Sequence, residues 1–331
     1  MMRSIIPPAL DCYGNPMIDI HISLPLHALH MMRRLCGDEL HPPAAVIQKV
    51  LSYLRETWPR EYESAYITPA GGALQTAAAA ARQGAEVRFH GAVGNDHNGI
   101  LVDQYLEKAG ITGSLQTGSG PTGVMIYCRF LEEGQEVHRQ ILGAPGAALE
   151  YTIAHDHDLS DRNGGVYLEG FLSEASGIWS HPGLTGTGGP SLRGVDLGSP
   201  HGAVRVLPLL KHYHGQGVFV IFGTTRELRP IQPELDQRSV QDIMVVEKRG
   251  SSGAACRYKG REAVVDALAL EEPVHPFDTV GAGDVFAWGF LSVLLASGRC
   301  DEHVCVQALH RGAQMAFQQI VALRGRRERL C

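Results

Sequence analysis

Short apolar runs that suit β-strands alternate along this chain with segments of helical pattern. Six runs are rich in β-branched or aromatic residues, namely 87–93, 124–131, 137–142, 166–168, 218–222 and 243–246. Helical patterns cover 73–83, the segment around 100–106, 281–296 and 302–323. The 39 glycines and 18 prolines gather where apolar runs end, as turns do. This alternation predicts an α/β fold, a doubly wound and mostly parallel sheet with helices on both faces.

Two stretches interrupt the alternation. Residues 21–68 do not continue it, and the runs 124–131 and 137–142 are joined only by the polar residues 132–136, which predicts an antiparallel hairpin. We assign these stretches to a small β-rich lid. The predicted organisation is one domain over 1–331, with lid segments at about 19–70 and 115–145 inserted in the α/β core.

Composition and charge exclude several classes of protein. Hydrophobic residues are 44% and charged residues 19% of the chain, which is ordinary for a globular protein. Lys and Arg (29) against Asp and Glu (35) give a net charge of −6, so we expect no nucleic-acid partner. The apolar stretch 285–296 is shorter than the roughly 20 residues that cross a bilayer. Since the N-terminus lacks an unbroken apolar core, we expect no signal peptide and a cytoplasmic protein.

Neither cysteine nor histidine forms a metal-binding pattern. The seven cysteines include no C-x-x-C pair, so reduced thiols are expected rather than disulfides or a zinc site. The run His-Asp-His-Asp at 155–158 lies between turn-like segments, which favours a solvated loop over a metal site.

The strongest local signal is the segment FDTVGAGDVFA at 277–287, where glycines lead into an apolar helix. Glycines let backbone N–H groups approach an anion, and the first turn of a helix adds unpaired donors and the positive end of its dipole. Asp284 within this turn is either a simple helix N-terminal residue or a general base. The base hypothesis also explains the glycines, and a loose phosphoryl-transfer transition state asks a weak base only for orientation and late proton acceptance.

Other nucleotide sites are excluded by spacing. None of the five lysines follows a glycine, so the P-loop pattern G-x-x-x-x-G-K-[ST] is absent. No strand pattern leads into G-x-G-x-x-G, which excludes the usual dinucleotide fingerprint.

The segment DTVGAGDVFAWGFL resembles the C-terminal signature of the ribokinase-like (PfkB) carbohydrate kinases. GGALQTA at 71–77 and RFHGAVGNDHNG at 88–99 resemble the N-terminal signature of the same family. YGNPMIDI at 13–20, GPTG at 120–123 and VYLEGF at 166–171 extend the resemblance over most of the chain. Within the family, GNPMID and the long insert before Gly71 look most like adenosine kinases and related nucleoside kinases. The resemblance implies a ribokinase-like fold and the use of ATP and Mg²⁺, and it leaves open whether a monovalent cation assists.

Carried over position by position, the resemblance makes Asp284 the catalytic base. It places the anion hole at the backbone of Gly281, Ala282 and Gly283. Substrate binding is implied for Asn15, Asp19, Gly71, Gly72 and Thr76, with Asp19 accepting hydrogen bonds from sugar hydroxyls. Nucleotide binding is implied for Thr224, Lys248, Gly250, Gly253 and Thr279. Glu227 would act on the metal through water.

Three positions depart from the family pattern. Thr76, Thr224 and Gly198 stand where members of the family commonly carry Asn. The departures indicate either a different substrate or reduced activity. Lys248 or Arg249 could meet the nucleotide phosphates, and a solvated charge pair is the alternative.

The predicted function is therefore ATP-dependent phosphorylation of a primary hydroxyl on a sugar or ribonucleoside, with an adenosine-like acceptor favoured. A non-catalytic sugar or nucleoside sensor on the same fold is the alternative, and a kinase for a hydroxymethyl heterocycle is a third hypothesis. We expect a small-molecule partner and either a monomer or a homodimer.

Overall fold

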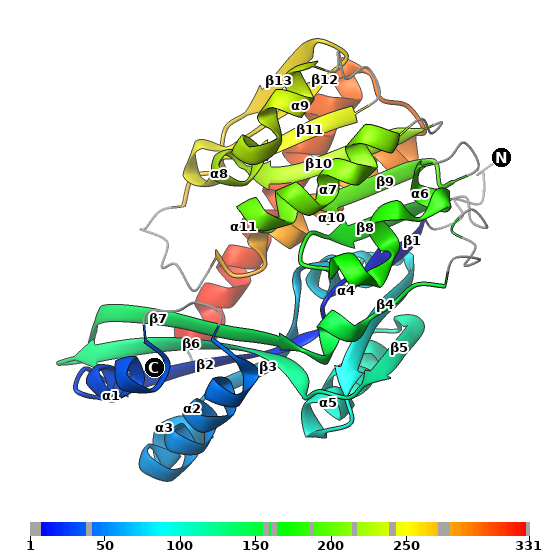
Figure 1. Cartoon of the computed structure of the whole chain (residues 1–331). Helices are drawn as coiled ribbons and strands as arrows, with labels where there is room; N and C mark the ends of the chain where they lie inside the picture. The colour runs from blue at the N-terminus through cyan, green and yellow to red at the C-terminus, as the bar shows by residue number, and fades with distance from the viewer. Residues whose placement is uncertain are drawn as a thin grey trace.

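A nine-stranded sheet forms the centre of the molecule (Figure 1). The computed structural model describes residues 8–37, 42–154, 159, 164–185, 189–213, 217–237, 243–270 and 279–328. The strands, in spatial order, are β13 (Arg261–Val265), β12 (Ala254–Tyr258), β11 (Ile243–Lys248), β10 (Val218–Thr224), β9 (Leu192–Asp196), β8 (Gly165–Glu169), β1 (Ala9–Tyr13), β4 (Glu86–Gly94) and β5 (Thr112–Gly118). The pairs β11–β12 and β12–β13 are antiparallel and the others are parallel, which confirms the predicted sheet.

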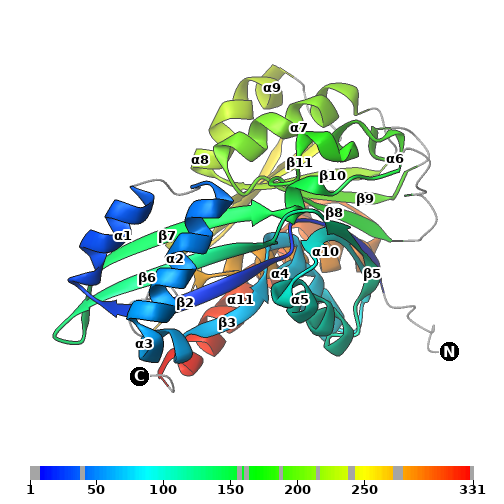
Figure 2. The same cartoon turned by 60° about the horizontal axis from the view of Figure 1, so that its bottom comes forward.

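Helices cover both faces of this sheet (Figures 1 and 2). One face carries α6 (Pro182–Thr185), α7 (Pro200–His212), α8 (Thr225–Leu228) and α9 (Gln232–Gln237), and the other carries α4 (Gly72–Arg82), α10 (Ala282–Ser297) and α11 (Glu302–Glu328). Helix α5 (His97–Lys108) packs against β4 and β5. The predicted helices 73–83, 281–296 and 302–323 correspond to α4, α10 and α11, and α11 continues five residues further than predicted.

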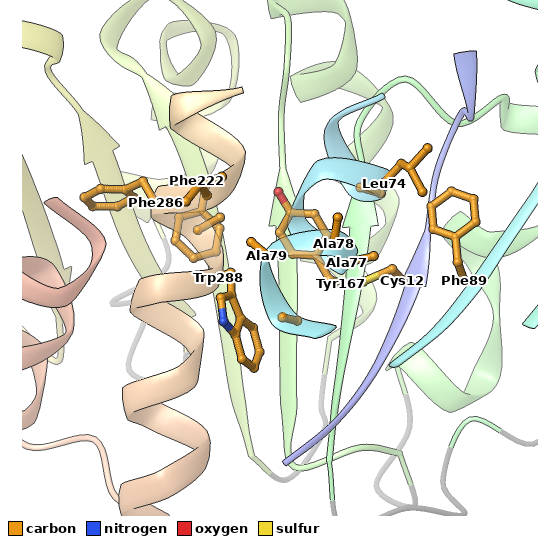
Figure 3. Close-up of a cluster of buried hydrophobic side chains, with 14 of the residues drawn as sticks. Cys12, Leu74, Ala77, Ala78, Ala79, Phe89, Tyr167, Phe222, Phe286 and Trp288 are labelled. Atoms are coloured by element: carbon orange, nitrogen blue, oxygen red, sulfur yellow. The ribbon is translucent and has the colours of Figure 1, made fainter. Parts of the chain in front are cut away.

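The side chains of each central strand point alternately into two hydrophobic cores, one on each face of the sheet. On β10, Phe219 and Ile221 pack into the core under α7, whereas Val220 and Phe222 pack into the core under α4 and α10. In the second core Trp288 and Phe286 of α10 lie beside Tyr167 and the alanines of α4 (Figure 3). Those alanines are buried and small, so α4 packs closely against α10.

A second sheet has four strands, in the order β3 (Tyr66–Ala70), β2 (Met17–Pro25), β6 (Thr122–Glu132) and β7 (Gln135–Gly146). Strands β6 and β7 form the predicted antiparallel hairpin, and β2 runs parallel to β6. Its apolar face is covered by α1 (Ala28–Cys36) and α2 (Ala44–Thr57), and α3 (Pro59–Glu63) follows α2. The stretch 21–68 is therefore largely helical rather than β-rich. Its helices bury alternate residues of β2, Ile18, Ile20, Ile22 and Leu24, and leave Asp19 and His21 on the opposite face.

No described helix is long and apolar enough to span a bilayer. The six cysteines in the described residues are free thiols, as predicted, and Cys331 lies outside those residues.

Replacing Phe89 of β4 by alanine should lower the free energy of unfolding by about 3–5 kcal/mol, because its fully buried ring would leave a cavity. Urea unfolding of the wild type and Phe89→Ala measures this loss. Ile100→Ala on α5 is the control, since Ile100 is 56% exposed and its truncation should change stability by less than about 0.5 kcal/mol. Equal losses in the two variants would contradict the assignment of Phe89 to the core.

Candidate active site

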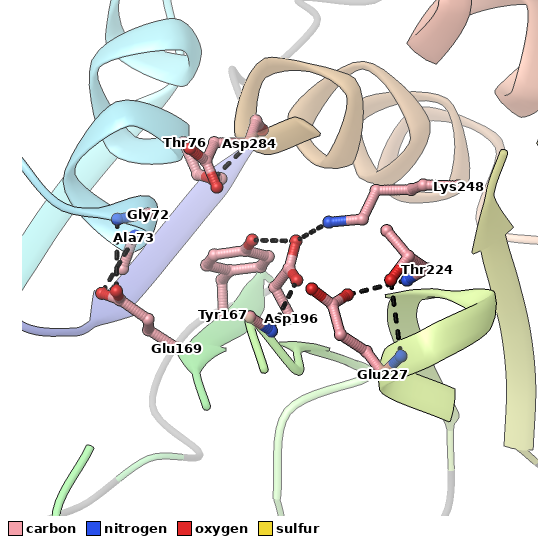
Figure 4. Close-up of polar contacts among 11 residues, drawn as sticks. Gly72, Ala73, Thr76, Tyr167, Glu169, Asp196, Thr224, Glu227, Lys248 and Asp284 are labelled. Atoms are coloured by element: carbon pink, nitrogen blue, oxygen red, sulfur yellow. Dashed lines mark hydrogen bonds and ion pairs between the residues drawn. The ribbon is translucent and has the colours of Figure 1, made fainter. Parts of the chain in front are cut away.

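Four polar residues end four neighbouring parallel strands at one edge of the large sheet. Glu169 is the last residue of β8, Asp196 of β9, Thr224 of β10 and Lys248 of β11 (Figure 4). The start of α10, with Asp284, faces the same edge (Figure 4). Ligands of open α/β sheets bind outside the carboxyl ends of the strands, so this edge is the candidate site.

Helix α4 reaches the site through two glycines. Gly71 has φ +116°, and a Cβ added there would lie 2.3 Å from the carbonyl oxygen of Asn15. A Cβ added at Gly72 would lie 3.0 Å from Oδ1 of Asp284. The backbone at 71–72 thus passes close to both Asn15 and Asp284 because neither glycine carries a side chain.

Glu169 holds this arrangement together, although it was not predicted as a site residue. Its carboxylate accepts hydrogen bonds from the backbone N–H groups of Asn15 (3.0 Å), Gly72 (3.3 Å) and Ala73 (3.3 Å). Burial raises the pKa of Glu169 to about 7, against the lowering effect of these hydrogen bonds. Its place at the end of a buried strand was the available signal.

Asp284 lies in the first turn of α10, close to three other carboxylates. Burial raises the pKa of Asp284 well above its usual range, the charges of Asp196, Glu169 and Asp19 raise it further, and Lys248 opposes them. The Thr76 hydroxyl donates to the backbone oxygen of Asp284 over 3.1 Å. Thr76 therefore joins α4 to α10.

Lys248 places a cation beside the N-terminus of α10. Its Nζ lies 2.5 Å from Oδ2 of Asp196, and a Cβ added at Gly283 would lie 3.3 Å from the same Nζ. Burial alone would lower the pKa of Lys248, but Asp196, Asp284 and Glu227 together raise it, so Lys248 stays charged. The N–H of Gly198 donates to Oδ1 of Asp196 over 3.2 Å.

Lys248, and not Arg249, faces the site. Nη2 of Arg249 lies 2.7 Å from Oε2 of Glu247 and 3.4 Å from Oε1 of Glu262, which line a separate pocket of about 350 Å³. Lys248 therefore remains the candidate for phosphate contact, whereas Arg249 forms a partly exposed ion pair.

Thr224 and Glu227 form a capping box at the start of α8. Oε2 of Glu227 accepts from the backbone N–H of Thr224 over 2.7 Å, and the Thr224 hydroxyl accepts from the N–H of Glu227 over 3.4 Å (Figure 4). Oε1 of Glu227 takes no part in the capping box, so it is the oxygen more available to a hydrated metal ion.

Asp19 approaches the cluster from the second sheet. Burial raises the pKa of Asp19 to about 7, a hydrogen bond with Tyr127 lowers it, and Glu169 raises it. Asp196 and Tyr127, like Glu169, were not predicted as site residues.

The remaining predicted residues lie around this centre. The side-chain amide of Asn15 donates to the carbonyl of Phe171 over 3.0 Å. Gly281 caps α10 with φ +73°, Gly250 and Gly253 form the turn after β11 with φ +59° and +86°, and Thr279 is exposed just before α10. Residues 277 and 278 of the glycine-rich motif and the run 155–158 lie outside the described residues. Within the described ones, no group of three His, Cys, Asp or Glu side chains could hold a metal ion.

The raised pKa values of Asp19 and Glu169 predict a pH dependence of stability. Between about pH 4 and 7 the folded protein binds protons at these carboxyls that the unfolded chain has released, so their contribution to stability falls as pH rises, by up to about 1.4 kcal/mol per proton and pH unit. Asp19→Asn removes one such proton. Its free energy of unfolding minus that of the wild type should therefore increase from pH 4 to 7 and then level off.

Chemical denaturation at several pH values measures this difference, with Asp103→Asn on the exposed face of α5 as control. A difference for Asp19→Asn that does not vary with pH would show that Asp19 titrates normally.

The chain is similar to known proteins in part of its sequence and in its fold. Residues 54–177 match the model of the pfkB family carbohydrate kinases. The fold is similar to that of the adenosine kinase from Sinorhizobium meliloti (TM-score 0.70, 21% identity, 94% of this chain and 93% of that one). It is also similar to a probable sugar kinase from Rhizobium etli CFN 42 (TM-score 0.71, 21% identity, 93% and 91%) and to the Methanocaldococcus jannaschii nucleoside kinase, an archaeal member of the ribokinase family (TM-score 0.64, 16% identity, 93% and 90%).

The predicted resemblance to the ribokinase-like (PfkB) carbohydrate kinases is thereby confirmed, by a family match over residues 54–177 and by a common fold over nearly the whole chain.

Proposed function

We propose that the protein is an ATP- and Mg²⁺-dependent phosphotransferase that phosphorylates a primary hydroxyl of a sugar or ribonucleoside, with an adenosine-like acceptor favoured. The observation that carries the proposal is the convergence of Asp284, Lys248 and the first turn of α10 at the carboxyl edge of the sheet, with Asp19 approaching from the second sheet. The similarity to pfkB family carbohydrate kinases and to adenosine kinase structures supports it.

Asp284 is the general base in this proposal. Burial and the neighbouring carboxylates raise the pKa of Asp284, which makes its carboxylate a stronger base than an exposed aspartate. The backbone N–H groups of Gly281, Ala282 and Gly283 at the start of α10 would stabilise the transferred group, and Lys248, whose Nζ lies close to Gly283, would add a positive charge. Asp19, Asn15 and the backbone at 71–72 would bind the acceptor.

The charged residues proposed to bind the phosphate donor suit ATP with Mg²⁺. Lys248, Thr224, Thr279 and the turn with Gly250 and Gly253 would hold the nucleotide, and the outer oxygen of Glu227 would bind a metal-bound water. Bound ATP supplies the phosphoryl group, and Mg²⁺ offsets the charge on its oxygens.

The second sheet would act as the lid. It is built from residues 17–25, 66–70, 122–132 and 135–146, which overlap the predicted lid segments 19–70 and 115–145 but extend slightly beyond them. The charge of Asp19 on this sheet already acts on Asp284. Closure over the acceptor would exclude water, which otherwise competes for the phosphoryl group.

Asp284→Asn should lower kcat by roughly 10²- to 10⁴-fold, because the amide cannot accept the acceptor's proton. The assay measures ATP consumption with Mg²⁺ against adenosine, other ribonucleosides, ribose, fructose and phosphorylated hexoses. Asp103→Asn, the same change on the exposed face of α5, is the control and should keep full activity. Unchanged turnover in Asp284→Asn would exclude Asp284 as the base. Ligand-induced thermal stabilisation without any ATP consumption would favour the sensor.

Lys248→Met should raise the KM for ATP by about 10- to 100-fold, because a charge-assisted hydrogen bond to phosphate is lost. It should also lower the melting temperature, since Asp196 would keep a buried charge without its partner. Steady-state kinetics below that temperature measures the first effect. Lys108→Met on the exposed end of α5 is the matched control. A KM for ATP equal to that of the control would exclude Lys248 from phosphate binding.

A further inference from the structure

Tyr127 links the second sheet to the carboxylates of the site. It lies on β6, directly opposite His21 of β2 and Ile141 of β7. Its hydroxyl is hydrogen-bonded to Asp19, and the charges of both Asp19 and Asp284 act on it. Tyr127 therefore reaches from the second sheet toward the residues that the proposed function uses for acceptor binding and for proton transfer.

The ring of Tyr127 is held in place by its neighbours on the sheet. It stacks on the His21 ring with a centroid separation of 4.5 Å and an interplanar angle of 3°, and His21 in turn lies 5.8 Å from the ring of Tyr66. Burial, followed by the charge of Arg129, lowers the pKa of His21 to about 4, so the imidazole is neutral at pH 7. A packed, uncharged stack restricts the rotamers of Tyr127 and thus the direction of its hydroxyl.

The acceptor chemistry of Asp19 depends on this hydroxyl. An ionised carboxylate has about four sites that accept hydrogen bonds, so one bond from Tyr127 fixes its orientation and leaves sites for the two hydroxyls of a vicinal diol. A protonated carboxyl offers fewer sites.

We propose that Tyr127 is a positioning residue for Asp19, and that its hydroxyl orients the Asp19 carboxylate toward the hydroxyls of a neutral polyhydroxyl acceptor. This inference rests on the proposed function for its effect on catalysis. Its structural part concerns Asp19 alone and can be tested without turnover.

The charges around Asp19 determine the sign of the expected change. Burial, Glu169 from β8 and the mutual repulsion with Asp284 from α10 favour the neutral carboxyl, and the bond from Tyr127 on β6 opposes them. Loss of the hydroxyl should therefore raise the pKa of Asp19 above its value of about 7. More of the protein would then carry a neutral Asp19 at pH 7.

The first experiment compares Tyr127→Phe with Tyr66→Phe, which loses the same hydroxyl from the same row of the sheet. Tyr127→Phe should raise the KM for the acceptor by roughly 10- to 100-fold and change kcat and the KM for ATP by less than about 3-fold. The acidic limb of kcat/KM for the acceptor should move to higher pH. For an acceptor that lacks one hydroxyl of the diol, the effect should be smaller, because the two changes share one interaction.

The second measurement is a carbon-13 NMR titration of the Asp19 carboxyl, assigned with Asp19→Asn. The pKa of Asp19 should rise in Tyr127→Phe and stay at the wild-type value in Tyr66→Phe. An unchanged pKa, or an equal rise in both variants, would overturn the inference. A wild type that phosphorylates no acceptor would instead overturn the proposed function, and the titration would still decide the role of Tyr127.

Discussion

The carboxylate of Glu169 is the contact on which the geometry of the site depends. It is buried at the end of β8 and accepts hydrogen bonds from Asn15, after β1, and from the first amides of α4. The start of α4 is thereby tied to the edge of the sheet, so close to Asp284 that a Cβ at Gly72 would lie 3.0 Å from its Oδ1. Thr76, one turn along α4, then reaches the backbone of Asp284. Three hydrogen bonds from backbone amides to Glu169 thus fix the start of α4, and Thr76 of α4 fixes the first turn of α10. The N–H groups of that turn and the Asp284 carboxylate carry the proposed chemistry.

The charge balance of the site limits what can bind there. Asp19, Glu169, Asp196 and Asp284 interact electrostatically with one another, the ammonium group of Lys248 lies beside Asp196, and burial raises the pKa of three of the four carboxyls. Near Asp19 this excess of acceptors favours a ligand that brings hydrogen-bond donors and disfavours an anion. At the other end the α10 N-terminus and the ammonium group provide the positive field. In the proposed function, the same cluster would thus distinguish a neutral, hydroxyl-bearing acceptor from an anionic donor.

Periodicity and local motifs predicted the parallel sheet, its principal helices and the glycine-rich turn before α10, because these depend on residues close together in the sequence. Glu169 and Asp196 were not predicted as site residues. Each is a single carboxylate at the end of a strand and has meaning only where the sheet brings several strand ends together. Tyr127 was missed because its alternating strand shows which face it occupies but not what that face meets. The helices within 21–68 were missed although α2 has a clear helical pattern, since its buried residues Ile47, Val50, Leu51 and Leu54 recur at i, i+3, i+4 and i+7.

The three departures from the family pattern have local structural roles. The Thr76 hydroxyl donates to the backbone oxygen of Asp284, and the Thr224 hydroxyl accepts from the N–H of Glu227 in the capping box. Gly198 has φ +61°, and a Cβ there would lie 2.6 Å from the ring of Phe171. A side chain at 198 would thus be strained and would displace the ring of Phe171. The backbone oxygen of Phe171 accepts a hydrogen bond from the side-chain amide of Asn15. These residues therefore maintain the positions of Asp284, of the start of α8 and of Phe171, which binds the Asn15 side chain. Their presence is an argument for a maintained active site rather than for one that has lost its contacts.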